Sequence, residues 1–291
     1  TSGPGATNLI TGIACSWFDS IPSIHITGQV NKAESASFLG ANVRQAGFQE
    51  TNIVDMVKPI TKYAVQVSSG DELVQELNKA YKIAISGRMG PVLIDVPMNV
   101  QKEIIQNSLL LTEDSKDSKD SKASKSDTDK FLDIKSFINS EFKKASRPLV
   151  LIGAGVGLSD TQDEILEWLN INNIPFVSSW GGSQYINHDL ENYYGNIGVY
   201  GNRGANFIVQ NCDCLLVLGS RLDSRQRSGN ADSFAPNANI VVVDIDNEEL
   251  KKYNSDKYKI FKLDLKLFTQ IINKLDIPPI NTNYKSYILK M

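Results

Sequence analysis

Short apolar runs alternate with amphipathic stretches along most of the chain. Three apolar runs in the first hundred residues predict strands: 23–27, 63–67 and 91–96. Between the last two, the apolar positions of one stretch recur at helical spacing: Leu73, Leu77, Ala80, Tyr81 and Ala84. We expect this helix over 71–86, with Asp71 as its N-cap and Gly87 at its C-terminal end. A shorter helix is expected at 52–57.

The same alternation restarts after residue 131. Helices are expected at 134–144 and 162–169. Five apolar runs predict strands: 149–152, 175–178, 214–218, 240–245 and 259–262. Because strands alternate with helices in both halves, the fold class is predicted to be α/β, with two doubly wound parallel-sheet domains, the second having about six strands.

The composition changes abruptly between the two halves. Residues 114–122 repeat Asp-Ser-Lys three times, and Ser, Lys and Asp continue to dominate up to residue 130. A stretch without apolar residues cannot offset its ordering entropy, so we expect no fixed structure there; a short amphipathic helix is the alternative. The domains are therefore assigned to residues 1–103 and 131–275, with a low-complexity linker at 104–130. Residues 276–291 contain two adjacent prolines and are expected to be an outgoing connection without a core of their own.

Composition excludes several classes of partner. The 291 residues carry 30 basic and 33 acidic side chains, a formal charge of −3, which is not the signature of a nucleic-acid-binding protein. No apolar run approaches the roughly 20 residues of a membrane span. The three cysteines are predicted to be reduced packing residues of a cytoplasmic protein: Cys15, Cys212 and Cys214.

The first eight residues, Thr-Ser-Gly-Pro-Gly-Ala-Thr-Asn, are the most informative local motif. A Gly-Pro-Gly turn running into a helix exposes backbone N–H groups with few side chains in the way, so it suits a closely approaching ligand. We expect a chain that begins inside such a motif to be part of a longer enzyme.

Three segments of the second half carry candidate binding residues. Gly153-Ala154-Gly155-Val156-Gly157 follows a strand but lacks the complete dinucleotide fingerprint, so a ligand contact and a purely geometric turn both remain open. Arg221 follows the predicted strand 214–218 and can bind a phosphate or flavin, or else pair with neighbouring aspartates. Asp244 can accept a ribose hydroxyl, or the segment can simply cap the next helix.

Other catalytic arrangements are not predicted. His25 lies on an apolar strand and is expected to be a satisfied core residue, whereas His188 lies in a polar loop. Neither can be combined with Ser, Cys or Asp into a nucleophilic triad, which counts against simple hydrolases. No carboxylate cluster suggests a metal site within the chain.

Several motifs together resemble the large subunit of acetolactate synthase and its thiamine-diphosphate (ThDP) dependent relatives. In the first half they are residues 1–8, 19–22, 26–30, 48–50, 60–62 and 86–97. In the second half they are residues 219–223, 234–238 and 243–246. The motifs occur in family order and cover nearly all of the chain except the linker.

The resemblance implies a partial domain that binds the aminopyrimidine of ThDP, followed by a central Rossmann-like domain. It implies that Pro4, Gly5, Asn8 and Gln49 bind ThDP, and that Phe48 and Gln49 act at the reacting centre. FAD is an additional cofactor that such central domains can bind. The residues implied for it are Arg88, Gly153, Gly155, Gly198, Arg221, Asp244 and Asp264.

The implied reaction is decarboxylation of a pyruvate-like 2-ketoacid and ligation of the remaining two-carbon unit to a second carbonyl, as in branched-chain amino acid biosynthesis. The family's catalytic glutamate is expected upstream of Thr1, and its diphosphate and Mg²⁺ ligands downstream of Met291, so the chain alone is expected to be inactive. Family active sites form between subunits, which implies a homodimer or homotetramer.

Three departures from the family pattern affect the substrate and the flavin. The segment 35–46 is several residues longer than usual and carries Arg44 and Gln45, and Met98 replaces a family lysine. The loop 198–201, Gly-Val-Tyr-Gly, lacks the histidine that flavin-dependent members have there. One alternative is therefore a different ThDP-dependent carboligase or lyase with another acceptor. Another is a non-catalytic nucleotide-binding or interaction module.

Overall fold

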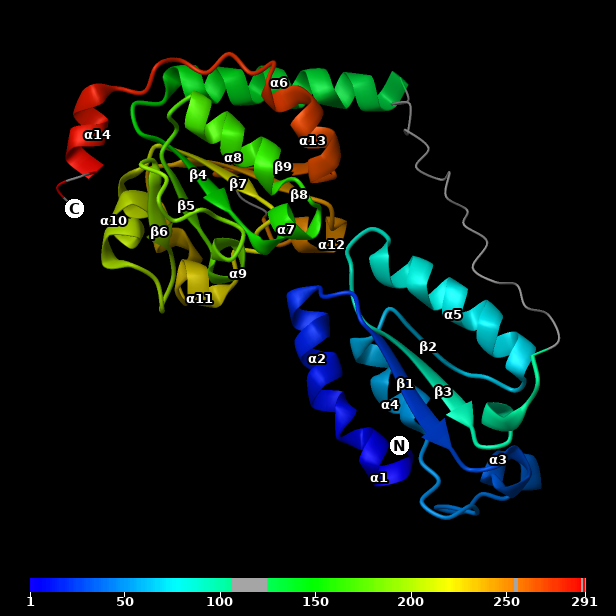
Figure 1. Ribbon diagram of the computed structural model, residues 1–291. Coiled ribbons are helices and arrows are strands. Elements are labelled where there is room, and N and C mark those ends of the chain that lie inside the picture. The colour runs from blue at the N-terminus through cyan, green and yellow to red at the C-terminus, as the bar shows by residue number, and fades with distance from the viewer. Residues whose placement is uncertain (106–124, 254–255, 289, 291) are drawn as a thin grey trace. The chain divides into compact units, whose positions relative to one another are not determined.

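The computed structural model describes residues 1–105, 125–253, 256–288 and 290 (Figure 1). The chain divides into two compact units, residues 1–120 and 121–291. Both units are built on parallel sheets with helices on their faces, so the predicted α/β fold class is confirmed. Among the described residues, no helix is both long enough and apolar enough to cross a membrane.

The first unit has a three-stranded parallel sheet in the order β1-β3-β2. Its strands are β1 (Ile24–Gln29), β2 (Tyr63–Gln66) and β3 (Val92–Pro97). Its helices are α1 (Gly3–Thr7), α2 (Leu9–Asp19), α3 (Ala36–Leu39), α4 (Ile53–Val57) and α5 (Gly70–Ile85), with 3₁₀ turns at Lys32–Glu34, Lys58–Ile60 and Val100–Lys102. The positions of β1, β2, β3 and α4 agree with the apolar pattern.

The central strand β3 explains how this unit is packed. On one face Val92 and Ile94 pack with Ala80 of α5, and on the other Leu93 packs with Ile53 of α4. All of β3 is buried, as expected for a parallel strand covered on both faces.

Helix α5 begins earlier than predicted. Ser69, not Asp71, is its N-cap, because the Ser69 hydroxyl accepts a hydrogen bond from the Glu72 N–H at 3.2 Å. Asp71 therefore lies inside the first turn. At the other end Ser86 closes the helix and Gly87 follows with φ +53°, the left-handed conformation that favours glycine.

The second unit has a six-stranded parallel sheet in the order β6-β5-β4-β7-β8-β9. Its strands are β4 (Pro148–Ile152), β5 (Phe176–Ser178), β6 (Tyr193–Asn196), β7 (Cys214–Leu218), β8 (Asn239–Asp244) and β9 (Tyr258–Lys262). The sequence pattern locates all of these except β6. That edge strand, Tyr-Tyr-Gly-Asn, is only half-buried and has no apolar run to reveal it.

Helices cover both faces of this sheet (Figure 1). They are α6 (Lys125–Lys144), α7 (Ala154–Leu158), α8 (Gln162–Ile171), α9 (Trp180–Ser183), α10 (Arg203–Asn211), α11 (Ser224–Arg227), α12 (Asn247–Leu250), α13 (Leu265–Ile272) and α14 (Thr282–Ile288), with a 3₁₀ turn at Ala231–Ser233. The chain order reverses between β4 and β7, so the loops that follow these two strands flank the topological switch point.

Three expectations from the sequence need revision or stay open. Most of the predicted linker, 106–124, lies outside the described residues, but helix α6 already begins at Lys125, inside the predicted linker. The segment 276–291 has no separate core, yet Tyr284 and Ile288 are buried in that of the second unit. Cys212 and Cys214 are buried as expected, whereas Cys15 is exposed on α2 and is not a packing residue.

Candidate functional site

The opening turn of the chain lies against the loop that carries Gln49. Ser2 is extended, Gly3 has φ +54°, and α1 follows with Pro4 in its first turn. A Cβ atom built on Gly3 would lie 2.8 Å from the Gln49 Cβ and closer still to the Gln49 carbonyl oxygen. Glycine is therefore required here so that the turn and the Gln49 loop can touch.

The residues predicted around this contact are open to solvent. Pro4, Asn8 and Gln49 are exposed, and the Phe48 side chain is 82% exposed. Asn8 ends α1 one turn after Pro4, and its side chain makes no capping hydrogen bond to α2. The turn and the Gln49 loop are thus brought together, and their predicted functional side chains are not covered by other residues of the first unit.

Gln49 is held in an unusual backbone conformation. Its φ of +58° is left-handed, which costs a residue with a Cβ about 1 kcal/mol or more. The Gln49 N–H donates to Gln45 Oε1 at 3.1 Å, and the Thr51 hydroxyl donates to the Gln49 carbonyl at 3.3 Å. Gly47 packs on Val30, where an added Cβ would lie 2.8 Å from the nearest Val30 atom. Local contacts on both sides of Gln49 therefore oppose its relaxation.

The Glu50 carboxylate organises the preceding loop. It accepts hydrogen bonds from the N–H of Ala36 at 2.9 and 3.0 Å, of Ala46 at 3.0 Å and of Gly47 at 3.4 Å. Partial burial raises the pKa of this carboxyl, but the N–H donors of Ala46, Ala36 and Gly47 outweigh that effect, so its pKa lies below the usual value. The charged form of Glu50 is what holds the loop.

A second buried carboxylate links the sheet to the same loop. Asp95 on β3 is fully buried and accepts hydrogen bonds from Thr27 Oγ1 at 2.7 Å, Gln66 Nε2 at 2.8 Å and Gln29 Nε2 at 3.2 Å. Gln29 Nε2 also donates to the Thr51 carbonyl at 2.7 Å. Asp95 therefore reaches the Gln49 loop through one intervening side chain.

Sequence reasoning missed the roles of Glu50 and Asp95. Glu50 was noted only as part of a family motif, and a hydrogen-bond acceptor for backbone groups has no spacing signature. Asp95 did have a signal, because a carboxylate within the apolar run 92–96 must be buried and satisfied by neighbouring strands. The partners Thr27 and Gln29 lie on the next strand of the sheet, in register with β3.

The glycines of the second unit also pack against protein. A Cβ on Gly153 would lie 2.6 Å from the Ser220 Cα, and one on Gly155 would lie 2.8 Å from the Gly219 Cα. The Gly155 N–H donates to the Gly219 carbonyl at 3.0 Å. On Gly157 the added Cβ would fall on the ring of Tyr185. Contacts within the unit thus account for all three glycines at the switch point.

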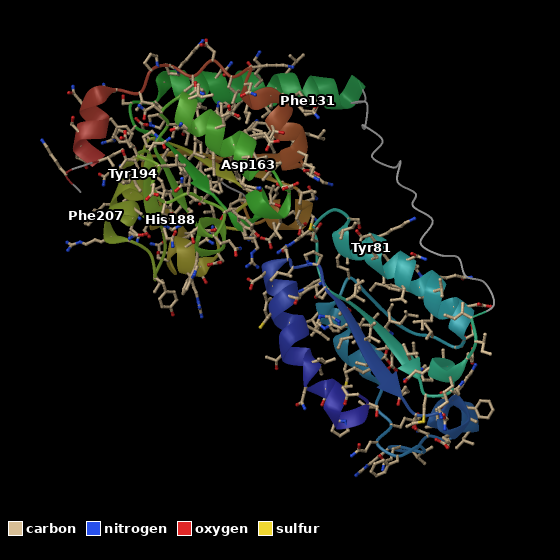
Figure 2. The ribbon with its side chains drawn as sticks, viewed as in Figure 1. Tyr81, Phe131, Asp163, His188, Tyr194 and Phe207 are labelled. Carbon is tan, nitrogen blue, oxygen red and sulfur yellow. The ribbon has the colours of Figure 1, made fainter. Side chains whose placement is uncertain are left out.

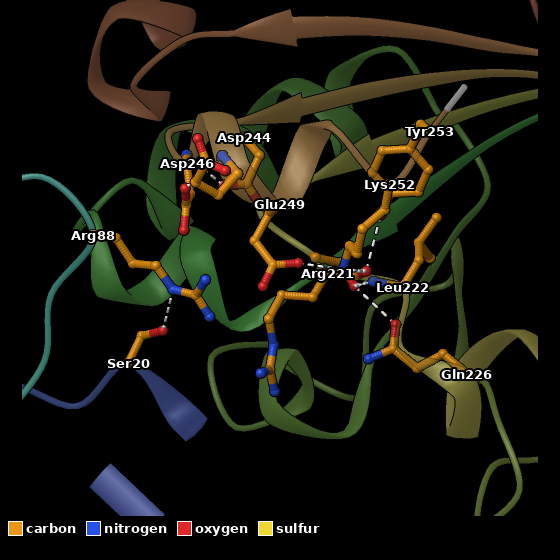
Figure 3. Close-up of polar contacts among 12 residues, drawn as sticks. Ser20, Arg88, Arg221, Leu222, Gln226, Asp244, Asp246, Glu249, Lys252 and Tyr253 are labelled. Atoms are coloured by element: carbon orange, nitrogen blue, oxygen red, sulfur yellow. Dashed lines mark hydrogen bonds and ion pairs between the residues drawn. The ribbon is translucent and has the colours of Figure 1, made fainter. Parts of the chain in front are cut away.

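The polar residues predicted for FAD in the second unit make local contacts there, which at Arg221 involve the backbone carbonyl. The Arg221 carbonyl accepts from Tyr253 Oη at 2.9 Å and from Lys252 Nζ at 3.0 Å (Figure 3). Asp244 accepts from the Asp246 N–H at 2.8 Å, and Asp264 is the N-cap of α13, accepting from the Lys266 N–H at 2.9 Å.

The last two predicted FAD residues lie in different units. Gly198 has φ +100° and packs on the Arg225 carbonyl, where an added Cβ would lie 2.8 Å away. Arg88 belongs to the first unit, where its Nε donates to the Ser20 hydroxyl at 3.0 Å (Figure 3).

The two histidines have local partners. His25 is half-buried, with Nε2 2.9 Å from the Ser23 hydroxyl, and burial lowers its pKa. His188 is exposed in the loop before β6 (Figure 2). The centroid of its ring lies 5.3 Å from that of Tyr193. Among the described residues, no group of three or more His, Cys, Asp and Glu side chains is arranged to hold a metal ion.

Both units match models of known protein families. Residues 1–56 match the model of the thiamine pyrophosphate enzyme N-terminal TPP binding domain, and residues 137–275 that of the thiamine pyrophosphate enzyme central domain.

Similar curated proteins are named as acetolactate synthase large subunits. The isozyme 2 large subunit of Escherichia coli K12 is 34% identical over 252 residues, 87% of this chain and 42% of that protein. The large subunit of Porphyra purpurea is 34% identical over 287 residues, 99% of this chain and 46% of that protein. The isozyme 1 large subunit of Escherichia coli K12 is 37% identical over 252 residues. The chain thus spans less than half the length of these relatives.

Proposed function

Since the chain belongs to the thiamine pyrophosphate enzyme family, we propose that the protein decarboxylates a pyruvate-like 2-ketoacid and ligates the product to a second carbonyl, as an acetolactate synthase does. Because the relatives are more than twice as long, this activity is proposed for the protein expressed from its complete reading frame. We expect residues 1–291 alone to be inactive, because the resemblance assigns the catalytic glutamate and the Mg²⁺ ligands to family segments that residues 1–291 do not match.

One observation carries the proposal: the opening turn and the Gln49 loop meet at Gly3, and the side chains around the contact are exposed. A flat, uncharged ring needs backbone without bulky side chains on one side and neutral hydrogen-bond donors nearby. The turn supplies the first, and the amides of Asn8 and Gln49 supply the second. These residues therefore fit the aminopyrimidine of ThDP.

The roles of the chain's own residues follow from their chemistry. When bound, ThDP supplies the electron sink for decarboxylation. The Gln49 and Asn8 amides donate hydrogen bonds to the substrate oxygen atoms that become negatively charged during the reaction. The amides themselves neither gain nor lose a proton. Phe48 covers the reacting centre with an apolar ring and excludes water from it.

Other features of the proposal rest on the resemblance. Mg²⁺ would bind the diphosphate of ThDP, and a homodimer or homotetramer would complete the site between subunits. FAD stays a prediction: the packing of Gly153 and Gly155 against Gly219 explains those glycines without a ligand, so we assign no step to a flavin.

An activity measurement tests the proposal. The protein expressed from its complete reading frame is incubated with pyruvate, ThDP and Mg²⁺, and acetoin is assayed after acidification. Acetoin that depends on ThDP is expected. If neither acetoin nor the ligation product of any other added carbonyl acceptor forms from pyruvate, the carboligase assignment is wrong.

Gln49 offers a variant that separates chemistry from folding. Gln49→Gly removes the amide but suits the left-handed backbone, so we expect turnover to fall at least tenfold while stability changes by less than about 1 kcal/mol. Asn173→Gly is the matched control, since Asn173 is also exposed and left-handed, at φ +51°, but lies in the second unit. Equal activity of the two variants would show that the Gln49 side chain has no part in catalysis.

A further inference from the structure

The loop of residues 35–47 carries one basic side chain, Arg44, the only one between Lys32 and Lys58. Two neighbouring carboxylates are already engaged: Glu50 accepts backbone N–H groups, and Asp55 pairs with Lys58. Arg44 is exposed, and within the described residues its guanidinium has no hydrogen bond or ion pair. Its positive charge is therefore available to a ligand.

The residues that follow Arg44 fix its place beside Gln49. Gln45 Oε1 accepts from the Gln49 N–H at 3.1 Å, and the Ala46 and Gly47 N–H groups donate to Glu50. Consecutive Cα atoms lie about 3.8 Å apart, so Arg44 starts one residue from a side chain that touches Gln49. Because these contacts form a closed turn, the loop holds the arginine near the proposed site.

We propose that Arg44 binds the anionic group of the acceptor substrate, a carboxylate or a phosphate. This inference rests on the proposed function and names the class of acceptor that the site selects. A guanidinium stays charged at all working pH values and offers two parallel N–H donors to such an anion. The neighbouring Phe48 ring, 82% exposed, supplies apolar surface for the carbon chain of the same molecule.

Glu50 then acts as a positioning residue. Its charged carboxylate holds Ala36 and Ala46 together, and so closes the loop on which Arg44 is carried. Loss of this charge frees the loop without removing the arginine. Glu50→Gln should therefore raise the KM for an anionic acceptor more than it lowers kcat.

A competition between matched acceptors tests the role of Arg44. With pyruvate as donor, the enzyme is given 2-ketobutyrate and propanal together, which differ by a carboxylate, and both products are quantified by mass spectrometry. In a second reaction, glyceraldehyde 3-phosphate competes with glyceraldehyde. Whichever pair loses its discrimination in the variants identifies the anion as carboxylate or phosphate.

The ratio of products is independent of how much enzyme is folded. Arg44→Gln should lower the anionic-to-neutral ratio by about ten- to a hundredfold, the range for a charged hydrogen bond, and Arg44→Lys should restore part of it. Lys102→Gln, a control at an exposed basic residue of the same unit, should leave the ratio unchanged. Unchanged ratios for both pairs in Arg44→Gln would overturn the inference.

A labelling experiment decides the question without turnover. Phenylglyoxal is reacted with the enzyme in the presence of ThDP and Mg²⁺, and modified arginines are identified by peptide mass spectrometry. Arg44 should be labelled, and 2-ketobutyrate or glyceraldehyde 3-phosphate, but not the neutral analogues, should protect it; exposed Arg203 should be labelled throughout.

Either of two labelling results contradicts the inference. If Arg44 is labelled equally with and without the anions, it does not bind them. If it resists labelling before any acceptor is added, another protein surface covers it. Absence of ThDP-dependent turnover, with protection of Arg44 intact, would instead reject the proposed function alone.

Discussion

Both units contain a glycine-rich turn that runs into a short helix, but the two turns pack differently. In the second unit Gly153 and Gly155 lie against Gly219, so the backbones of the loops after β4 and β7 are in direct contact at the topological switch point. In the first unit Gly3 lies against Gln49, which has a side chain, a left-handed backbone and exposed neighbours.

A glycine motif by itself therefore does not reveal a ligand. In each turn the space that glycine opens is occupied by the protein's own chain. What distinguishes the first turn is its partner: a polar, exposed and strained residue is a candidate for function, whereas a second glycine indicates close packing only.

The largest effect is expected from closing the second turn. Gly153→Ala would place its Cβ against the backbone of Gly219 and Ser220, which cannot move without distorting β7. We expect a loss of about 3 kcal/mol in the free energy of unfolding, measured by chemical denaturation. Gly229→Ala, at an exposed glycine with nothing within 4 Å, is the control. Similar small effects of both variants would show that the turns are not tightly packed.

The second-largest effect is expected from removing the buried carboxylate of the first unit. Asp95→Ala leaves Thr27, Gln29 and Gln66 without their acceptor, so we expect unfolding to become easier by about 2 to 3 kcal/mol. ThDP affinity should fall with it, because Gln29 also holds the Thr51 carbonyl. Asp71→Ala, in the first turn of α5, is the comparison. An unchanged ThDP affinity would separate the Asp95 network from the site.

A smaller loss of stability is expected at Gly3. Gly3→Ala must keep φ +54° and also push on Gln49, at a cost of about 1 to 2 kcal/mol. Gly40→Ala meets the same backbone penalty at φ +63°, but nothing lies within 4 Å of its added Cβ. Calorimetric titration should show ThDP binding weakened at least tenfold in Gly3→Ala alone. Equal weakening in both variants would attribute the effect to backbone strain.

The smallest effect is a pH dependence confined to the 35–47 loop. Because the Glu50 pKa is below its ordinary value of 4.5, the ionised carboxylate stabilises the loop fully above that pH, and the effect is lost as the pH falls through the lowered pKa. The amide NMR signals of Ala36, Ala46 and Gly47 should shift together with a midpoint below 4.5. Independent midpoints, or a common one above 4.5, would show that the Glu50 carboxylate does not hold these three N–H groups.

The sequence predicts the regular parts of the fold well because they follow apolar periodicity. Buried strands such as β3, β4 and β7 are continuous apolar runs, and α5 has a clear apolar face. The edge strand β6 was missed because its half-buried tyrosines and glycine show no alternation of apolar and polar residues. The observed starts of α5 and α6 differ from the predicted ones. The Ser69 cap of α5 and the polar first turns of α6 have only weak sequence signals.

The candidate site could be predicted only in part. Residues of the opening turn and Phe48–Gln49 were identified through the family resemblance, and the structure brings the turn and the loop into contact. The hydrogen bonds that Glu50 accepts from the 35–47 loop could not be predicted. They depend on backbone N–H groups of a loop whose conformation has no sequence pattern. The close packing of Gly153 on Gly219 likewise requires two loops that lie 66 residues apart in the chain.

We propose that ThDP binds across the contact between the opening turn and the Gln49 loop. Hydrogen exchange followed by mass spectrometry tests it on the protein expressed from its complete reading frame, with and without ThDP and Mg²⁺. Peptides covering residues 1–8 and 44–52 should both gain protection when the cofactor binds. Binding of ThDP that leaves the exchange of both peptides unchanged would place the cofactor elsewhere and contradict this site.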